Sequence, residues 1–388
     1  MPDLWPTNLG PVICVVGARP NFMKMAPILQ AFAAHQPAIP TLLLHTGQHY
    51  DRDMNDKLFE DLRLPHPDIN LEVGSGSHAV QTAEVMRRFE PVLDEKKPSC
   101  VLVVGDVNST LACTLVAVKK GIPVVHVEAG LRSYDRTMPE EINRVLTDQV
   151  ADLLYTTERS ATANLAREGI APERVRFVGN VMIDSLLNNR EFARPPADSV
   201  RAANCDPSLI AGQEGYGVVT MHRPSNVDHA DVLASLLGVL REISEAIPLV
   251  FALHPRTKSN IDRFELSHLI NTPRMVMLPP QGYLEMLGLM AGARIVLTDS
   301  GGLQEETTAL GVPCLTMREN TERPITVEQG TNTMVGRDVA AIRHHANETL
   351  AGRGKSGRVP ELWDGHTAER IAADLSFWLL ARHLDSGH

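Results

Sequence analysis

Short apolar runs alternate with amphipathic helical patterns along almost the whole of this 388-residue chain. This alternation is typical of parallel β-sheets that helices cover on both faces. In the first half, apolar runs predict strands at 12–16, 41–45, 101–104, 123–127, 153–156 and 175–178. In the second half, they predict strands at 217–221, 249–253, 275–278, 294–298 and 312–317. The expected fold class is therefore α/β, with two doubly wound Rossmann-like domains.

The chain is long enough for two domains that each bury a core of their own. Residues 188–207, with Pro195-Pro196 and mixed charges, interrupt the rhythm and are the best candidate for a linker. We expect an N-terminal domain over residues 1–187 and a C-terminal domain over residues 206–365. The pattern at 367–383 predicts an amphipathic helix, and we expect residues 366–388 to pack back on the first domain.

Composition excludes several classes of function. A net charge of −10 disfavours non-specific binding to nucleic acid or to anionic membranes. The five cysteines lack CxxC spacing, which favours reduced core residues. No apolar stretch approaches the roughly 18 residues of a spanning helix, and residues 1–10 lack the regions of a signal peptide. We expect a cytoplasmic protein.

A glycine turn in the second half is a candidate phosphate site. Ser300, Gly301 and Gly302 lie between an apolar strand and a run that favours a helix, so backbone N–H groups there would open the helix toward an anion. Glu306, one turn later, could accept hydrogen bonds from sugar hydroxyls, and Arg323 could pair with a phosphate. Because short glycine motifs occur often by chance, an ordinary strand-to-helix turn remains an alternative.

Three carboxylates follow strands of the first half. Ligands of open α/β sheets bind at the carboxyl ends of the strands, where Asp106, Glu128 and Glu140 are expected. Such clustering can raise a carboxyl pKa toward neutrality and so create a base. Helix N-capping is an equally good explanation of Asp106, and a first-turn interaction with the helix dipole is one for Glu140.

Three further polar residues follow strands and have ordinary structural explanations too. Arg19 and Lys24 follow the first strand, where they could be a solvated helix start. His222 follows the first strand of the second half, where it could be a hydrogen-bonded strand-end histidine.

Several reaction classes lack their motifs. The run Gly17-Ala18-Arg19-Pro20 is not GxGxxG, so nicotinamide binding is disfavoured. The chain has no HExxH, no set of Cys and His ligands, no Walker lysine and no GxSxG elbow. The remaining chemistry is acid–base or transfer chemistry on an anionic nucleotide substrate without a redox cofactor.

Taken together, the motifs closely resemble those of the non-hydrolysing UDP-N-acetylglucosamine 2-epimerases. They run in the same order over nearly the whole chain: Gly17-Ala18-Arg19-Pro20 with Lys24, His45-Thr46-Gly47-Gln48-His49, Gly105-Asp106, His126-Val127-Glu128-Ala129-Gly130-Leu131-Arg132, Pro139-Glu140-Glu141-Ile142-Asn143-Arg144, His222-Arg223, and Thr298-Asp299-Ser300-Gly301-Gly302-Leu303-Gln304-Glu305-Glu306.

The resemblance implies a GT-B-like arrangement with an interdomain cleft, a UDP-sugar substrate, no cofactor, no metal and a homodimer. It implies reversible conversion of UDP-GlcNAc to UDP-ManNAc, by anti elimination of UDP to a 2-acetamidoglucal and re-addition. The acid–base carboxylates would belong to the first domain and UDP binding to the second. The implied catalytic residues are Asp106, Glu128, Glu140 and His222. The implied substrate- and UDP-binding residues are Arg19, Lys24, Arg144, Gln281, Ser300, Gly301, Gly302, Glu306 and Arg323.

The chain departs from the family pattern in two segments associated with a second, allosteric UDP-GlcNAc site. Tyr50 and Asp51 replace an arginine and a glutamine, and Pro224-Ser225-Asn226 replaces Arg-Glu-Asn. We therefore expect activation by UDP-GlcNAc not to follow the usual form, although His254 is kept. Met286 stands where relatives carry an aromatic residue, a mild change because methionine fills apolar gaps flexibly.

Four alternatives remain open. A hydrolysing epimerase would release ManNAc and UDP, and a related epimerase would act on another UDP-amino sugar. A GT-B glycosyltransferase would share the fold and the glycine turn but needs at most one base. A nucleotide-sugar sensor would bind without exchanging the C2 proton.

Overall fold

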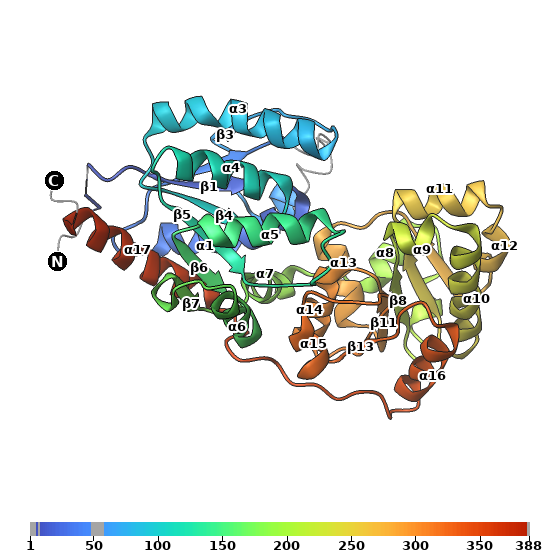
Figure 1. Cartoon of the computed structure of the whole chain (residues 1–388). Coiled ribbons are helices and arrows are strands. Elements are labelled where there is room, and N and C mark those ends of the chain that lie inside the picture. Colours follow the sequence, from blue (N-terminus) through green and yellow to red (C-terminus); the bar gives the residue numbers. More distant parts are fainter. Residues whose placement is uncertain (1–4, 7, 48–57, 386–388) are drawn as a thin grey trace. The chain divides into compact units, whose positions relative to one another are not determined.

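The computed structural model describes residues 5–6, 8–47 and 58–385, in which helices and parallel strands alternate along the chain (Figure 1). The chain divides into two compact units. Unit 1 comprises Met1–Asn188 and Glu361–His388, and unit 2 comprises Asn189–Pro360. Both units are parallel sheets with helices, so the predicted fold class is confirmed.

Unit 1 contains a seven-stranded parallel sheet in the order β3-β2-β1-β4-β5-β6-β7. The strands are β1 (Val12–Val16), β2 (Thr41–His45), β3 (Ile69–Asn70), β4 (Cys100–Val104), β5 (Val124–Ala129), β6 (Leu153–Thr156) and β7 (Val175–Phe177). The strand order reverses between β1 and β4, which pair directly with Val12 opposite Cys100. Such a reversal is where open α/β sheets bind ligands.

The main helices of unit 1 are α1 (Arg19–Ala34), α3 (His78–Lys96), α4 (Asn108–Lys119), α5 (Pro139–Val150), α6 (Arg159–Arg167), α7 (Val181–Asn189) and α17 (Thr367–Asp385). Helix α17 lies where the sequence pattern predicts a helix, and it packs against α1. The Tyr155 hydroxyl of β6 donates a 2.9 Å hydrogen bond to Asp374 of α17. The last helix is therefore part of the fold of unit 1.

Unit 2 contains a six-stranded parallel sheet in the order β10-β9-β8-β11-β12-β13. Its strands are β8 (Gly217–Thr220), β9 (Leu249–Ala252), β10 (Met275–Leu278), β11 (Ile295–Thr298), β12 (Cys314–Thr316) and β13 (Asn332–Met334). Its helices are α8 (Pro196–Ala202), α9 (Pro224–Val227), α10 (Ala230–Ala246), α11 (Pro255–Arg263), α12 (Ser267–Ile270), α13 (Tyr283–Ala291), α14 (Gly301–Leu310), α15 (Pro324–Glu328) and α16 (Val339–Leu350). The order reverses between β8 and β11.

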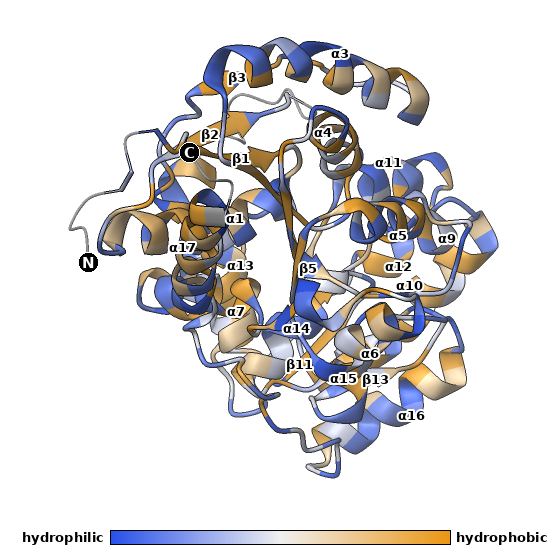
Figure 2. Ribbon diagram, turned by 60° about the vertical axis from the view of Figure 1, so that its left-hand side comes forward, coloured by the Kyte–Doolittle hydropathy of each residue, from blue (hydrophilic) through white to orange (hydrophobic). Residues whose placement is uncertain are grey.

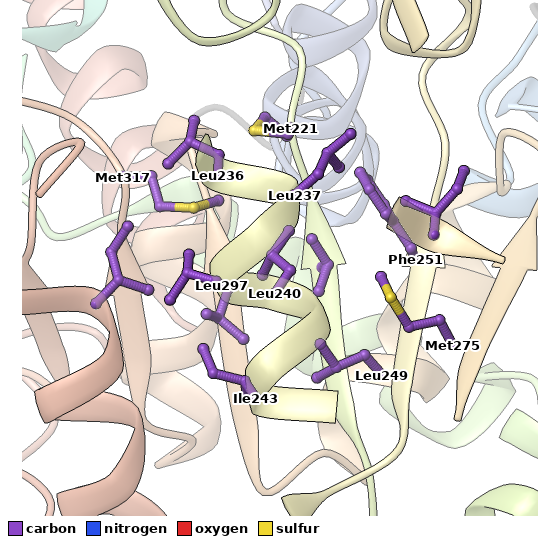
Figure 3. Close-up of a cluster of buried hydrophobic side chains, with 14 of the residues drawn as sticks. Met221, Leu236, Leu237, Leu240, Ile243, Leu249, Phe251, Met275, Leu297 and Met317 are labelled. Carbon is purple, nitrogen blue, oxygen red and sulfur yellow. The ribbon is translucent and has the colours of Figure 1, made fainter. Parts of the chain in front are cut away.

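The central strands are mainly apolar because helices cover both faces of each sheet. Every residue of β1, β4 and β5 is buried, and Figure 2 shows β1 and β2 in the colours of hydrophobic residues, whereas α3 mixes hydrophilic and hydrophobic positions. In unit 2, Leu237 and Leu240 of α10 pack with Phe251 and Leu297 of the sheet (Figure 3). This packing holds the sheet edges that carry the polar residues.

Each of the eleven predicted strands forms, with ends within two residues of the predicted ones. Sequence reasoning missed β3 and β13, the outermost strands of the two sheets. β3 has only two residues, and neither is buried. The segment predicted as a linker contains α8 and lies within unit 2, because Val200 is buried in a core cluster of that unit. Among the described residues, no helix combines the length and apolar composition needed to cross a membrane.

Candidate active site

Two carboxylates lie at neighbouring strand ends of unit 1. Asp106 follows β4 by two residues, and Glu128 is the last residue but one of β5. β4 and β5 pair in register, with Val104 opposite Val127. The sheet therefore brings the regions of Asp106 and Glu128 together at its carboxyl edge.

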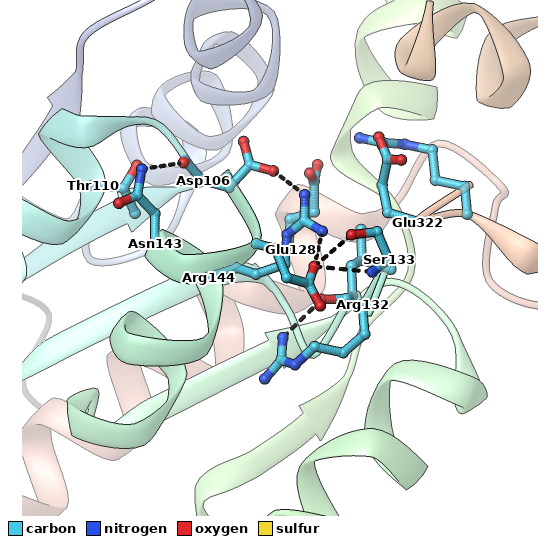
Figure 4. A network of polar contacts seen from close by, with 12 residues as sticks. Asp106, Thr110, Glu128, Arg132, Ser133, Asn143, Arg144 and Glu322 are labelled. Atoms are coloured by element: carbon cyan, nitrogen blue, oxygen red, sulfur yellow. Dashed lines mark hydrogen bonds and ion pairs between the residues drawn. The ribbon is translucent and has the colours of Figure 1, made fainter. Parts of the chain in front are cut away.

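Asp106 is held by residues of helix α5. Nη2 of Arg144 lies 2.6 Å from Oδ2 of Asp106, and Asn143 donates a 2.9 Å hydrogen bond to the Asp106 carbonyl (Figure 4). The same guanidinium contacts Glu141 at 2.5 Å, and Glu141 also accepts hydrogen bonds from the backbone N–H groups of Ser133 and Tyr134. Asp106 is not the N-cap of α4, because that position belongs to Val107. N-capping therefore does not explain Asp106.

Glu128 is paired with Lys24 of helix α1. The Lys24 side chain is 6% exposed and the Glu128 side chain 2%. Nζ of Lys24 lies 2.6 Å from Oε2 of Glu128. Glu128 has φ +71°, and the pairing of β5 with β6 shifts register between Val127 and Ala129. A non-glycine residue with positive φ costs free energy and marks positions where the surroundings force an orientation. Lys24, predicted to bind substrate, contacts Glu128 directly.

Glu140 and Arg19 lie at helix starts of unit 1. Glu140 is half-buried in the first turn of α5, where it interacts favourably with the helix dipole. Arg19 is the first residue of α1 and is also half-buried. For both residues the geometry is compatible with a helix-start role as well as with substrate contact.

The predicted glycine turn of unit 2 forms. Ser300 is the N-cap of α14, which begins at Gly301 directly after β11, and Gly302 is half-buried. The Ser300 N–H donates to Oγ1 of Thr298 at 2.9 Å. A Cβ added at Gly301 would lie 2.8 Å from Oε1 of Glu322, so no larger residue fits without movement. A larger residue here would have to displace the Glu322 and Arg323 side-chain ends.

Arg323 lies in a buried ionic network next to this turn. Its Nε is 2.8 Å from Oε2 of Glu305, and its Nη1 is 2.5 Å from Oε1 of Glu322. Arg318 adds a second cation, 2.8 Å from the other Glu322 oxygen. Arg323, predicted to pair with phosphate, is thus already neutralised by carboxylates within unit 2.

Glu306 is 2% exposed in α14, and Tyr283 lies next to it at the start of α13. Burial, and then the negative charge of Glu306 and a hydrogen bond with it, raise the pKa of the Tyr283 phenol well above its usual range. Gln281, just before α13, is half-buried and donates to the Pro279 carbonyl at 2.7 Å. Sequence reasoning did not single out Tyr283.

His222 is oriented by Asp299. The side chain of His222 is 38% exposed, and its Nδ1 lies 3.0 Å from Oδ1 of the fully buried Asp299. Asp299 also accepts the backbone N–H groups of His222 and Arg223 and the side chain of Asn226. The His254 ring lies 5.4 Å from the His222 ring. His222 therefore presents its other ring nitrogen from a fixed orientation.

The comparisons with known proteins agree with this geometry. A family model described as UDP-N-acetylglucosamine 2-epimerase matches residues 32–376. This chain belongs to that family. The UDP-N-acetylglucosamine 2-epimerase of Methanocaldococcus jannaschii is 40% identical over 94% of this chain and 98% of its own length. A Pseudomonas aeruginosa UDP-2,3-diacetamido-2,3-dideoxy-D-glucuronate 2-epimerase is 40% identical over 84% of this chain and 88% of its own.

Solved structures of the family share the fold. The crystal structure of the Methanocaldococcus jannaschii UDP-GlcNAc 2-epimerase in complex with UDP-GlcNAc and UDP has a TM-score of 0.83. It is 40% identical in sequence, and the match covers 94% of this chain and 99% of that one. The GT-B-like fold class expected from the sequence is thereby confirmed.

Three buried residues that contact the candidate site residues or their neighbours were not given roles from the sequence. Asp299, His126 and Asp148 are fully buried, and their contacts join segments distant in the chain. Asp148 carries no motif signal that could have identified it. Gln48, His49, Tyr50 and Asp51 lie outside the described residues. Within the described ranges, no cluster of His, Cys, Asp and Glu side chains could hold a metal ion.

The contacts of Asp299 predict a pH-dependent contribution to stability. Burial acts to raise its pKa, but hydrogen bonds and charge from His222 and backbone N–H groups outweigh burial and lower the pKa. A lowered folded-state pKa stabilises the protein above the unfolded value of about 3.9 and loses that effect as the pH falls through the folded value. We expect Asp299→Asn to destabilise the protein at neutral pH by about 1–3 kcal/mol, because an amide cannot accept all of these bonds. Denaturant unfolding should show this difference shrinking at strongly acidic pH, and a difference independent of pH would contradict it.

Proposed function

We propose that this protein interconverts UDP-GlcNAc and UDP-ManNAc by eliminating and re-adding UDP. The observation that carries the proposal is the pair of carboxylates at neighbouring strand ends of unit 1, each with its own cation. Asp106 is bound to Arg144, and Glu128 to Lys24. Epimerisation at one carbon needs a base for one face and an acid for the other, and two separately held carboxylates suit that requirement.

The C2 hydrogen of the sugar is not next to a carbonyl, so simple deprotonation is unfavourable. In the proposed reaction, a carboxylate takes the C2 proton while the C1–O bond to UDP breaks. The electron pair of the C–H bond forms the C1=C2 bond of a 2-acetamidoglucal, and UDP leaves with the bonding pair of the C1–O bond. Protonation of C2 on the opposite face and attack of the UDP oxygen on C1 then give the epimer, so the reaction is redox-neutral.

Asp106 and Glu128 are the proposed acid–base groups, with Glu140 as a third member. Asp106 is the more accessible of the first two, because its side chain is 25% exposed and that of Glu128 only 2%. Arg144 and Lys24 hold the two carboxylates in place through ion pairs of 2.6 Å each. The half-buried Arg19 at the start of α1 is proposed to contact the substrate anion.

Unit 2 is proposed to hold UDP. The N-terminus of α14, formed by Ser300, Gly301 and Gly302, would bind the diphosphate through backbone N–H groups. His222 would donate a hydrogen bond to the departing diphosphate, since Asp299 fixes its ring. Glu306 and Gln281 would contact the nucleoside. Arg323, already bound to two carboxylates, would act by supporting the turn at Gly301.

A second candidate substrate is supported by the Pseudomonas aeruginosa relative, which is named for a UDP-diacetamido uronate and is 40% identical. The Methanocaldococcus jannaschii relative is equally similar but matches over more of this chain. We therefore propose UDP-GlcNAc first and the uronate second. We also expect a homodimer, which light scattering of the purified protein would test.

Proton NMR of the purified protein with UDP-GlcNAc in D₂O, without added NAD or metal, tests the proposal. The expected result is UDP-ManNAc that carries deuterium at C2, because the abstracted proton exchanges with solvent before re-addition. Free ManNAc and UDP would instead indicate a hydrolysing epimerase. Exchange only with the UDP-diacetamido uronate would move the substrate to the second candidate, and no exchange with either would contradict an epimerase function.

A further inference from the structure

A fully buried histidine, His126, is connected by hydrogen bonds to the backbone segments that carry both proposed acid–base carboxylates. His126, in the middle of β5, is 0% exposed. Its Nδ1 lies 2.6 Å from Oδ1 of Asp148, and its Nε2 lies 2.8 Å from the carbonyl oxygen of Gly105. Both partners are hydrogen-bond acceptors. A neutral imidazole donates from only one nitrogen, so a ring that donates to both partners carries a proton on each nitrogen and a positive charge.

The charges around this ring balance. Asp148 and Glu168 are the anions, and Arg132, 2.8 Å from Asp148 and 2.6 Å from Glu168, is the second cation beside His126. Burial acts to raise the pKa of Asp148, but the charges of His126 and Arg132 and a hydrogen bond from the His126 ring outweigh it and lower the pKa. The two carboxylate oxygens of Asp148 are thus shared among the His126 ring, the Gly130 N–H and the Arg132 guanidinium.

His126 is linked to Asp106 through the Gly105 carbonyl. The Gly105 carbonyl that accepts the His126 bond belongs to the peptide group directly before Asp106, and Gly105 has φ +67°. Asn143 holds the Asp106 carbonyl, and Arg144 holds its carboxylate. Because Asn143, Arg144 and Asp148 all belong to α5, one helix fixes Asp106 on three sides.

Asp148 is linked to the segment around Glu128 through the Gly130 backbone N–H. Asp148 binds His126 through Oδ1, and through Oδ2 it accepts the backbone N–H of Gly130 at 3.0 Å. His126 and Gly130 flank Glu128 two residues away on either side, and Glu128 and Gly130 both have positive φ. A Cβ at Gly130 would lie 2.5 Å from the Ala161 carbonyl oxygen. The Asp148 carboxylate thus binds the residues on both sides of Glu128, His126 through its ring and Gly130 through its backbone N–H.

We infer that His126 and Asp148 form a charged positioning pair that sets the geometry of Asp106 through the Gly105 carbonyl and that of Glu128 through the Gly130 N–H. The inference rests on the proposed function, in which those two carboxylates are the acid–base groups. Neither member of the pair touches substrate in this role.

Stability alone is a poor explanation of such a pair. Desolvation of two charges often outweighs their attraction, so well-packed apolar residues commonly serve as well or better. Apolar residues could not accept the Gly130 N–H or donate to the Gly105 carbonyl. A misplacement of about 1 Å can lower a rate about 10²-fold, and the pair fixes the two peptide groups that determine where both carboxylates point.

The inference is tested with the full-length protein and two matched substitutions. In His126→Asn the side-chain amide can replace Nδ1 and keep the bond to Asp148, but the bond to Gly105 is lost. In His126→Gln the longer amide can replace Nε2 and keep the bond to Gly105, but the bond to Asp148 is lost. His268→Asn, on the exposed residue of α12, is the control.

We expect kcat to fall about 10²-fold in both variants, with KM and the UDP dissociation constant changed less than about threefold. The variant His126→Asn should lose almost nothing more when it is combined with Asp106→Asn, because it acts through Asp106. Losses that multiply, or a near-normal kcat in His126→Asn, would overturn the inference.

A second measurement does not depend on activity. ¹⁵N NMR of the wild-type protein labelled at histidine should show a proton on both ring nitrogens of His126 at neutral pH. A ring protonated on one nitrogen would overturn the inference even if the variants did not fold. An inactive wild-type protein with a doubly protonated ring would instead place the failure in the proposed function.

Discussion

Replacing Asp106 with asparagine should reduce turnover of the UDP-sugar by about 10²- to 10⁴-fold, the range that a positioned acid or base typically contributes. Asparagine is nearly the same size and can still accept a hydrogen bond from Arg144, which lies 2.6 Å from the present carboxylate. It cannot take or give a proton. Because the turn at Ser300 and the His222 side chain, both proposed to bind the diphosphate, belong to unit 2, the UDP dissociation constant measured by calorimetry should change little.

The matched control is Asp94→Asn. Asp94 also carries an ion pair, 2.7 Å from Lys120, but its side chain is 63% exposed on α3. Exposed pairs contribute about 0–1 kcal/mol, so this variant should keep wild-type turnover. Turnover within about threefold of wild type in Asp106→Asn would remove Asp106 from the acid–base group. Equal losses in both variants would point to a general effect of the substitution on folding.

The fold was predictable because its signal is repeated and local. Fully buried strands such as β1 and β4 read as continuous apolar runs, and each is followed by a helical pattern. β13 escaped prediction because it has only three residues, two of them polar, and side-chain hydrogen bonds from distant segments add to its pairing with β12. Asn332 bonds to Thr316 and Gln304, contacts that no local pattern reveals.

The positions of the candidate residues on the fold were predictable, but their pairing was not. Position after a strand predicted both Asp106 and Glu128 at the carboxyl edge of the sheet, where the structure places them. Substrate binding by Lys24 and Arg323 stays a prediction, and the sequence did not indicate that both side chains contact carboxylates. Charge pairing between distant segments depends on where helices cross the sheet, and one sequence does not encode that crossing in any local pattern. For the same reason Asp148, deep in α5, gave no signal.

The pairing of Lys24 with Glu128 predicts a large loss of stability in Lys24→Met. Methionine matches the length of the lysine stem, so packing against the neighbouring residues of α1 is largely preserved. The substitution leaves the Glu128 carboxylate, 2% exposed, without the ammonium 2.6 Å away. Removing one partner of a buried ion pair typically costs about 3–5 kcal/mol, because the other charge stays buried and uncompensated. Denaturant unfolding followed by circular dichroism should show this loss.

Adding Glu128→Gln to Lys24→Met removes the stranded charge, and we expect the double variant to be more stable than Lys24→Met alone. Activity should not return, since glutamine cannot exchange the C2 proton. The control Lys120→Met removes an exposed cation from α4's C-terminal end and should cost no more than about 1 kcal/mol. If the double variant were instead as unstable as Lys24→Met, the loss of stability would not come from an uncompensated charge on Glu128. The neutralisation of Glu128 by Lys24 would then no longer explain why this helix carries a buried lysine.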